Sequence, residues 1–117
     1  MSVEVKFDFG GARVLVTGGS NGIGLGIAHA FADSNAQVSV TGRRGSASEY
    51  DSDLTGFDYH QAEMTDREGL ERLAGSFDRL DVLINNAGAS LMAENEWEPE
   101  IFEKALSLHL FASFRLA

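Results

Sequence analysis

Short apolar runs along the chain are separated by segments in which apolar residues recur at helical spacing. The apolar runs predict strands over residues 12–16, 36–41, 56–64 and 80–84. The first two are almost continuously apolar, as expected for strands of a parallel sheet that is buried on both faces. The third alternates Phe57 and Tyr59 with polar residues, which is typical of a strand nearer the edge of a sheet. The pattern predicts an α/β fold with the strand order 3-2-1-4.

Apolar residues one turn apart predict helices between these strands. Ile23, Ile27 and Phe31 lie four residues apart, so one face of their segment can pack on the sheet. A second helix is expected to begin with a capping box formed by Thr65 and Glu68. Its apolar face comprises Leu70, Leu73, Ala74 and Phe77.

Three further stretches complete the pattern. In residues 1–11, Phe7 and Phe9 are expected to cover the edge of the sheet. Residues 45–55 are polar with little periodicity, which predicts a loop or a short helix. From residue 101 onward the chain is apolar on several faces, so a helix buried on more than one side is expected, with Pro99 at its first position.

The turn between the first strand and the first helix is rich in glycine. Residues 17–24, called the glycine turn below, read Thr-Gly-Gly-Ser-Asn-Gly-Ile-Gly. Glycine adopts conformations that strain other residues, and its backbone N–H groups can approach a pyrophosphate without an intervening side chain. The N-terminus of the following helix adds unpaired donors and the positive end of its dipole. The glycine turn therefore predicts a phosphate-binding site.

The spacing T-G-x-x-x-G-I-G differs from the G-x-G-x-x-G and P-loop patterns and resembles the cofactor loop of the short-chain dehydrogenase/reductase family. Residues 85–88, Asn-Asn-Ala-Gly, match that family's N-N-A-G motif at the expected distance. The resemblance covers residues 11–117 and implies a Rossmann-type, doubly wound parallel sheet that binds NAD(P). It places the cofactor on Gly18, Ser20, Asn21, Gly22, Ile23, Asn86, Ala87 and Gly88.

The residues after the second strand bear on the choice of cofactor. An acid that binds the NAD ribose usually stands about 20 residues beyond the glycines, but Gly42 stands here, followed by Arg43 and Arg44. Without a carboxylate to repel a 2′-phosphate, NADP(H) is favoured over NAD(H), with Arg43 at the phosphate. The alternative is that both arginines are solvated loop residues. In the family an Asp and a hydrophobe contact the adenine from the third strand, and Glu63 and Met64 stand there, so a backbone contact is expected.

Composition limits the kinds of molecule that the protein is expected to bind and the compartment in which it is expected to reside. The net charge of −9 at pH 7 argues against binding to nucleic acid or to an anionic membrane. The absence of cysteine excludes disulfides and thiolate metal sites, and no metal site is predicted. No apolar run approaches the roughly 20 residues that span a bilayer. Because the N-terminus also lacks an apolar signal core, a cytoplasmic protein is expected.

The resemblance implies catalysis by a Tyr-x-x-x-Lys pair, whose tyrosine is the general acid/base. The pair is absent from this sequence, since Leu54 and Glu63 follow Tyr50 and Tyr59 at the lysine position. Family members also carry an asparagine that holds a water of a proton relay, where His109 stands here. This histidine either makes such a relay pH-sensitive or packs at an interface. Residues 1–117 are therefore expected to be the N-terminal, incomplete part of an NAD(P)-binding domain in a longer protein.

Two classes of function follow. The first is a short-chain oxidoreductase that transfers a hydride between NADP(H) or NAD(H) and a small-molecule carbonyl or alcohol. For this class the resemblance also implies a homo-oligomer, because the family's fourth helix forms much of a subunit interface. The second is a non-catalytic nucleotide-binding or scaffold module, which the missing Tyr/Lys pair favours.

Overall fold

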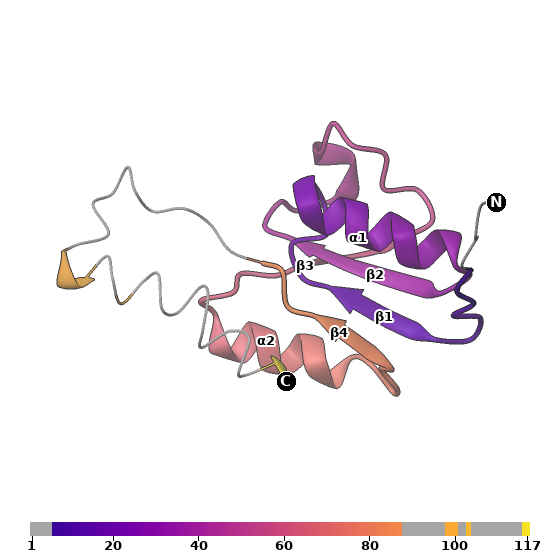
Figure 1. Ribbon diagram of the computed structural model, residues 1–117. Coiled ribbons are helices and arrows are strands. Elements are labelled where there is room, and N and C mark those ends of the chain that lie inside the picture. The colour runs from indigo at the N-terminus through magenta and orange to yellow at the C-terminus, as the bar shows by residue number, and fades with distance from the viewer. Residues whose placement is uncertain (1–5, 88–97, 101–102, 104–115) are drawn as a thin grey trace.

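The computed structural model describes residues 6–87, 98–100, 103 and 116–117. Its strands are β1 (Arg13–Val16), β2 (Gln37–Gly42), β3 (Asp58–Gln61) and β4 (Val82–Ile84). They form one parallel sheet in the predicted order β3-β2-β1-β4 (Figure 1). The main helices are α1 (Gly22–Asp33), the 3-10 helix η1 (Ala47–Glu49) and α2 (Arg67–Gly75). Within the described ranges, none of the helices has the length and apolar character that crossing a bilayer requires.

Helices α1 and α2 cover opposite faces of the sheet (Figure 1). Successive residues of a strand point to opposite faces, and the α1 side buries Val14, Val16, Ala28, Val38 and Val40. The α2 side buries Leu15, Ala62, Met64, Leu70 and Leu73. Full burial of one valine or leucine side chain contributes about 1.5–3 kcal/mol. These two apolar clusters therefore hold the three layers together and fix the ends of the strands relative to each other.

The N-terminal lead-in packs on the end of α1. The N–H of Phe9 donates to the carbonyl of Ser34 at 2.7 Å, and the Phe9 ring lies 5.1 Å from that of Phe31. Asn35 completes the helix end with a φ of +73°, a conformation that asparagine tolerates better than most residues. The expectation that the phenylalanines cover the edge of the sheet was wrong for Phe9, because this hydrogen bond ties it to the helix end.

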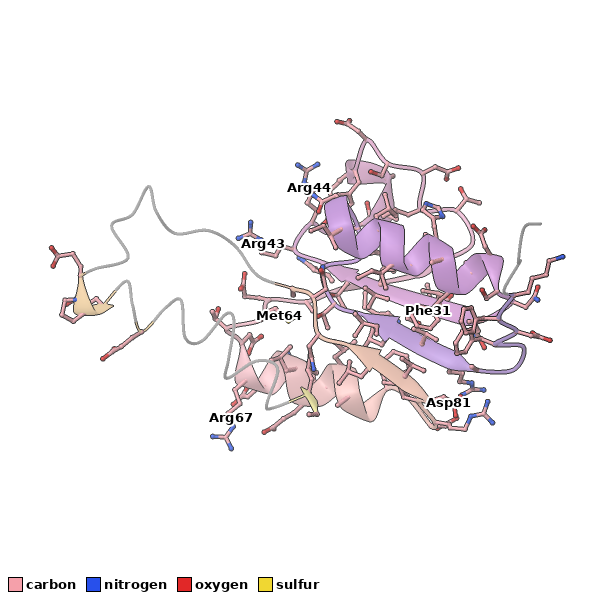
Figure 2. All side chains as sticks on the ribbon, viewed as in Figure 1. Phe31, Arg43, Arg44, Met64, Arg67 and Asp81 are labelled. Atoms are coloured by element: carbon pink, nitrogen blue, oxygen red, sulfur yellow. The ribbon has the colours of Figure 1, made fainter. Side chains whose placement is uncertain are left out.

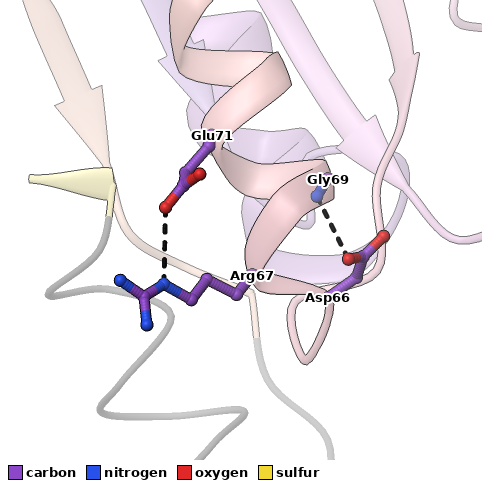
Figure 3. Close-up of polar contacts among 4 residues, drawn as sticks. All are labelled: Asp66, Arg67, Gly69 and Glu71. Atoms are coloured by element: carbon purple, nitrogen blue, oxygen red, sulfur yellow. Dashed lines mark hydrogen bonds and ion pairs between the residues drawn. The ribbon is translucent and has the colours of Figure 1, made fainter.

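The N-cap of helix α2 lies one residue after Thr65, the N-cap that the predicted capping box requires. Asp66 is the N-cap, and its carboxylate accepts a hydrogen bond from the N–H of Gly69 at 3.1 Å (Figure 3). The prediction of Thr65 was wrong because the Thr65 hydroxyl donates to the Glu63 carboxylate at 3.2 Å. The carboxylate of Asp66 is then left to satisfy the first turn of the helix.

Strand β3 is shorter than the predicted range 56–64. Gly56 has a φ of +91°, and the N–H of Phe57 donates to the carbonyl of Leu54 at 3.1 Å. A turn therefore occupies residues 54–57, and pairing starts at Asp58. Residues 45–55 contain the short η1, in line with the predicted loop or short helix. The helix expected from residue 101 onward, including His109, falls almost entirely outside the described residues.

Candidate functional site

The glycine turn leads from β1 into α1 and is exposed only at residues 21–23. Gly18 and Gly22 have φ values of +67° and +57°, a region that residues with a Cβ rarely adopt. Gly24 is needed for a different reason, because a Cβ at this position would collide with the carbonyl of Gly18 and the side-chain amide of Asn86. Three positions of the turn thus require the absence of a side chain.

The hydroxyl of Thr17 joins the glycine turn to the end of β4. Its Oγ1 donates to the carbonyl of Ile84 at 3.3 Å and accepts from the backbone N–H groups of Asn86 at 3.1 Å and Ala87 at 3.0 Å. Thr17 is 1% exposed, so the bonds are shielded from water. Loss of this one hydroxyl would remove the acceptor of the half-buried Ala87 N–H, which is more costly than losing an exposed bond, whereas the Asn86 N–H also donates to the carbonyl of Ile84 at 3.1 Å.

Asn86 makes the same connection from the opposite direction. Its Nδ2 donates to the carbonyls of Thr17 at 3.2 Å and Gly18 at 3.3 Å, in agreement with the expectation that it fixes its neighbours. Ala87 also lies against the turn, since a Cβ on Gly18 would stand 3.0 Å from the Ala87 Cα. Ligands of open α/β sheets bind outside the C-terminal ends of the strands, which is where these residues meet. Gly88, the last residue of the motif, lies outside the described residues.

The N-terminus of α1 presents backbone donors to the same end of the sheet. Asn21 is the N-cap, but its side chain makes no capping bond, and the first turn contains no acidic residue. The first N–H groups of a helix lack partners within the helix and carry partial positive charge. Ile23 is 80% exposed beside them, whereas Ser20 is 4% exposed. The Ser20 hydroxyl lies near the end of β2, 2.8 Å from the position of a Cβ on Gly42.

The end of β2 is attached to the glycine turn and carries the two arginines. Thr41 Oγ1 accepts a hydrogen bond from the Gly18 N–H at 3.0 Å. The backbone carbonyl of Arg43 accepts from Gln61 Nε2 of β3 at 3.1 Å. Arg43 is exposed, and its side chain projects from this end of the sheet (Figure 2). Its guanidinium makes no hydrogen bond or ion pair with another residue in the part of the chain that the structure describes.

Arg44, in contrast, is bound back to its own loop. Its guanidinium carbon lies 4.9 Å from the centroid of the Tyr50 ring, and its Nη1 donates to the carbonyl of Glu49. Of the two arginines, Arg43 therefore has the side chain that is available to a ligand.

The side chains of Glu63 and Met64 are engaged within the protein. The Glu63 carboxylate accepts from the backbone N–H of Thr65 at 3.4 Å and from its hydroxyl at 3.2 Å. Met64 is 6% exposed and packs in the α2 core with Leu15 and Leu70. A contact from these two residues to an adenine is thus left to the backbone.

The sequence analysis assigned no role at this site to three residues that shape this end of the sheet. Thr17, directly after β1, and Thr41, near the end of β2, are 1% and 0% exposed. A polar residue at the end of an apolar run is a signal that could have identified them, since buried polar groups need partners. Tyr50 lies in the segment without periodicity, where nothing in the sequence marks it.

Comparisons with known proteins give a consistent result. A family model described as short chain dehydrogenase matches residues 12–117. The chain is 34% identical to an L-fucose dehydrogenase of Oryctolagus cuniculus, with 92% of this chain and 40% of the relative covered. It is 30% identical to carbonyl reductase (NADPH) 2 of Sus scrofa, with 97% and 47% covered.

Solved structures agree with these relatives. The chain is similar to a Pseudomonas aeruginosa RhlG/NADP active-site complex, with a TM-score of 0.76 and 29% identity over 97% of this chain and 48% of that chain. The chain thus spans less than half the length of each of these three proteins.

Proposed function

Because the chain belongs to the short-chain dehydrogenase family, we propose that it forms the cofactor-binding part of an oxidoreductase. The reaction is the transfer of a hydride between a nicotinamide dinucleotide and a carbonyl or alcohol carbon. The cofactor is NADP(H) in preference to NAD(H). The observation that carries this proposal is the bare backbone of the glycine turn at the open N-terminus of α1.

The residues present suit the diphosphate of such a cofactor. The missing side chain at Gly22 leaves open space for close approach of an anion, whereas Gly18 and Gly24 allow the turn to pack closely against Asn86 and Ala87. The first turn of α1 offers N–H donors without a carboxylate that would compete or repel. Since Thr17 and Asn86 fix the turn to β4, the donors are held in place before a ligand arrives, which lowers the entropic cost of binding.

The preference for NADP(H) rests on the end of β2. Gly42 brings no carboxylate that would repel a 2′-phosphate, and the exposed Arg43 guanidinium has no partner among the described residues. A guanidinium makes charge-assisted, bidentate hydrogen bonds to phosphate oxygens. Two of the similar proteins are named for the same cofactor, a carbonyl reductase (NADPH) and a structure in complex with NADP.

The role of these residues is to bind and to orient. A nicotinamide held there would supply or accept the hydride. Ile23, exposed in the first turn of α1, and Ala87, at the end of β4, would offer apolar surface to the cofactor. The Thr17 and Asn86 bonds keep these two elements at a fixed separation.

The chemistry of the substrate belongs to residues that this sequence does not contain, since it has no Tyr-x-x-x-Lys pair. The proposed substrate is a small molecule with a carbonyl or hydroxyl group. A homo-oligomer stays a prediction from the family, because residues 104–115 lie outside the described part of the chain.

Titration of the full-length polypeptide with NADPH and NADH, followed by nicotinamide fluorescence, tests the proposal. We expect tighter binding of NADPH. Arg43→Ala should weaken NADPH binding by about 10- to 100-fold, the effect of losing a hydrogen bond to a charged group, and leave NADH binding nearly unchanged.

Arg67→Ala is the matched control, because it removes the same charge from an exposed arginine whose Nε lies 3.3 Å from Glu71 on the surface of α2 (Figure 3). It should leave both affinities unchanged. Binding of neither nucleotide would overturn the proposed function. Equal affinity for NADPH and NADH, unaltered in Arg43→Ala, would overturn only the cofactor preference.

A further inference from the structure

The space beside Gly42 is filled by a side chain from elsewhere in the chain. A Cβ on Gly42 would collide with the hydroxyl of Tyr50 and would stand 2.8 Å from the Ser20 hydroxyl. A carboxylate at position 42 would therefore compete with the Tyr50 hydroxyl for the same space. The end of β2 thus has a phenol group beside the position where a ribose-binding carboxylate is usual.

The Tyr50 hydroxyl is held in this position by several contacts. It accepts a hydrogen bond from the Arg44 N–H at 3.2 Å and lies 3.1 Å from the Tyr59 hydroxyl. Tyr59 itself donates to the carbonyl of Arg44 at 2.5 Å. The Arg44 guanidinium covers the Tyr50 ring from outside. The phenol is fixed from three sides and does not swing freely as an exposed tyrosine would.

The preceding loop is ordered by its own capping box. The Ser46 N–H donates to the Glu49 carboxylate at 2.8 Å, and the Ser46 side chain accepts a bond from the Glu49 backbone. The segment that delivers Tyr50 to the end of β2 is thus supported from both ends.

The hydrogen bonds direct the Tyr50 proton to the Tyr59 oxygen, so donation to a ligand requires that this proton turns from Tyr59 to the ligand. The single proton of Tyr59 is used in the bond to the Arg44 carbonyl, so the proton between the two phenols belongs to Tyr50. A neutral phenol can donate to a phosphate oxygen, whereas an ionised carboxylate can only accept and repels a phosphate.

We propose that Tyr50 is a specificity-determining residue of the dinucleotide site, whose hydroxyl binds the 2′-phosphate of the adenosine ribose beside Arg43. This inference rests on the proposed function and adds a residue that the glycine and arginine patterns do not indicate. Gly42 is then required because it makes room for the phenol as well as because it lacks a carboxylate.

The test compares two probes that differ only in the 2′-phosphate, adenosine 2′,5′-bisphosphate and adenosine 5′-monophosphate. Their dissociation constants are measured by calorimetry on the full-length polypeptide. In Tyr50→Phe we expect the affinity for the bisphosphate to fall about tenfold and that for the monophosphate to change less than twofold.

Tyr59→Phe is the matched control. It deletes the same kind of hydroxyl 3.1 Å from that of Tyr50 and should have the smaller effect on the bisphosphate. Gly42→Ala is a second, independent variant, because its Cβ displaces the Tyr50 hydroxyl without removing it. It should show the same selective loss as Tyr50→Phe.

Four results would overturn the inference. The first is an equal loss of affinity for both probes in Tyr50→Phe, and the second is an equal loss of bisphosphate affinity in Tyr50→Phe and Tyr59→Phe. The third is an unchanged bisphosphate affinity in both Tyr50→Phe and Gly42→Ala. The fourth is a gain of bisphosphate affinity in Tyr50→Phe, which would show that the phenol blocks the site. The proposed function survives each of them as long as the unaltered protein binds NADPH or NADH. If it binds neither nucleotide, the function and this inference fail together.

Discussion

At the scale of single residues, the site depends on a few buried hydroxyl and amide groups with several partners each. Thr17 Oγ1 has three hydrogen-bond partners, and Asn86 Nδ2 has two. Bonds of this kind are worth more inside a protein than at its surface because the dielectric constant is lower. The relative position of the glycine turn and β4 is therefore set by these two side chains together with the backbone pairing of β1 and β4.

The ionisation of Tyr50 leads to a prediction about pH. Burial acts to raise its pKa, but the hydrogen bonds with Ser20 and Tyr59, the bond from the Arg44 backbone N–H and the Arg44 charge hold the pKa below the ordinary value of 10.0. The pKa of Tyr59 is raised instead, by burial and by the neighbouring Tyr50 hydroxyl, with a further contribution from the charge of Glu49. Tyr50 is thus the first of the two to lose its proton.

Above its lowered pKa the Tyr50 phenol becomes an anion, which repels a 2′-phosphate. The dissociation constant for NADPH should therefore rise relative to that for NADH as the pH increases through the Tyr50 pKa, which lies below the ordinary value of 10.0. The two constants are measured by fluorescence titration at each pH. In Tyr50→Phe the ratio should stay constant over the same range. A ratio that changes equally in both proteins would assign the effect to another group.

The residues of the site differ in how readily the sequence reveals them. Gly18, Gly22 and Asn86 belong to short motifs whose spacing reflects a backbone requirement, and the structure shows that requirement as positive φ values and close contacts. Tyr50 was missed because the loop after β2 folds back onto the end of that strand, a contact that no helical or strand period encodes.

At the scale of helices and strands, substitutions at the N-terminus of α2 test which residue caps this helix. Asp66→Ala should lower the free energy of unfolding by about 1 kcal/mol, because it removes the acceptor for the Gly69 N–H. Thr65→Ala should change it by less than about half as much, since Thr65 bonds only to the exposed Glu63.

The measurement is the midpoint of urea unfolding, and Asp66→Asn serves as the control that keeps an acceptor while removing the charge. It should lose less than Asp66→Ala, because asparagine is also a good N-cap residue. Equal losses of unfolding free energy in Thr65→Ala and Asp66→Ala would contradict this assignment and favour the capping box predicted from the sequence.

Elements with a strong apolar period were predicted well, and their boundaries less so. The first two strands agree within one residue at each end, because two buried faces require continuous apolar residues. The start of β3 was misplaced by the turn at Gly56. The N-cap of α2 was misplaced because two adjacent residues, Thr65 and Asp66, could each cap, and the Glu63 side chain decides between them.

At the scale of the whole molecule, the site draws on elements that are far apart in sequence. The glycine turn, the end of β2 and the end of β4 meet only when the sheet is complete. A ligand that contacts all three must stabilise the folded state as a unit. NADPH at 100 times its dissociation constant should add about 2.7 kcal/mol, which at about 2–4 °C per kcal/mol for a chain of about 150–250 residues corresponds to a rise of about 5–11 °C in the melting temperature.

This rise is measured by differential scanning fluorimetry on the full-length polypeptide. Arg43→Ala should show a smaller shift at the same NADPH concentration and an unchanged shift with NADH. A melting temperature that NADPH does not alter in the unmodified protein would contradict the proposed binding.

The α/β class and the sheet order follow from the sequence because right-handed parallel crossovers and short connections leave few topologies, and the family follows from the resemblance of residues 17–24 and 85–88 to its two motifs. The position of the Arg43 and Arg44 side chains does not follow in the same way. Both arginines stand in one exposed loop. The Arg44 guanidinium contacts the ring of Tyr50 and donates to the carbonyl of Glu49, and these contacts hold it back on its own loop.

The collision between a side chain at position 42 and the Tyr50 hydroxyl also constrains how this protein can change. A designer who installs an aspartate at position 42 to favour NADH would crowd the phenol and disturb the loop behind it, so the single exchange should be harmful by itself. The two positions have to be altered together, with a smaller residue replacing the tyrosine. A side chain at position 42 is then tolerated only together with a substitution at position 50, although the two positions are eight apart along the chain.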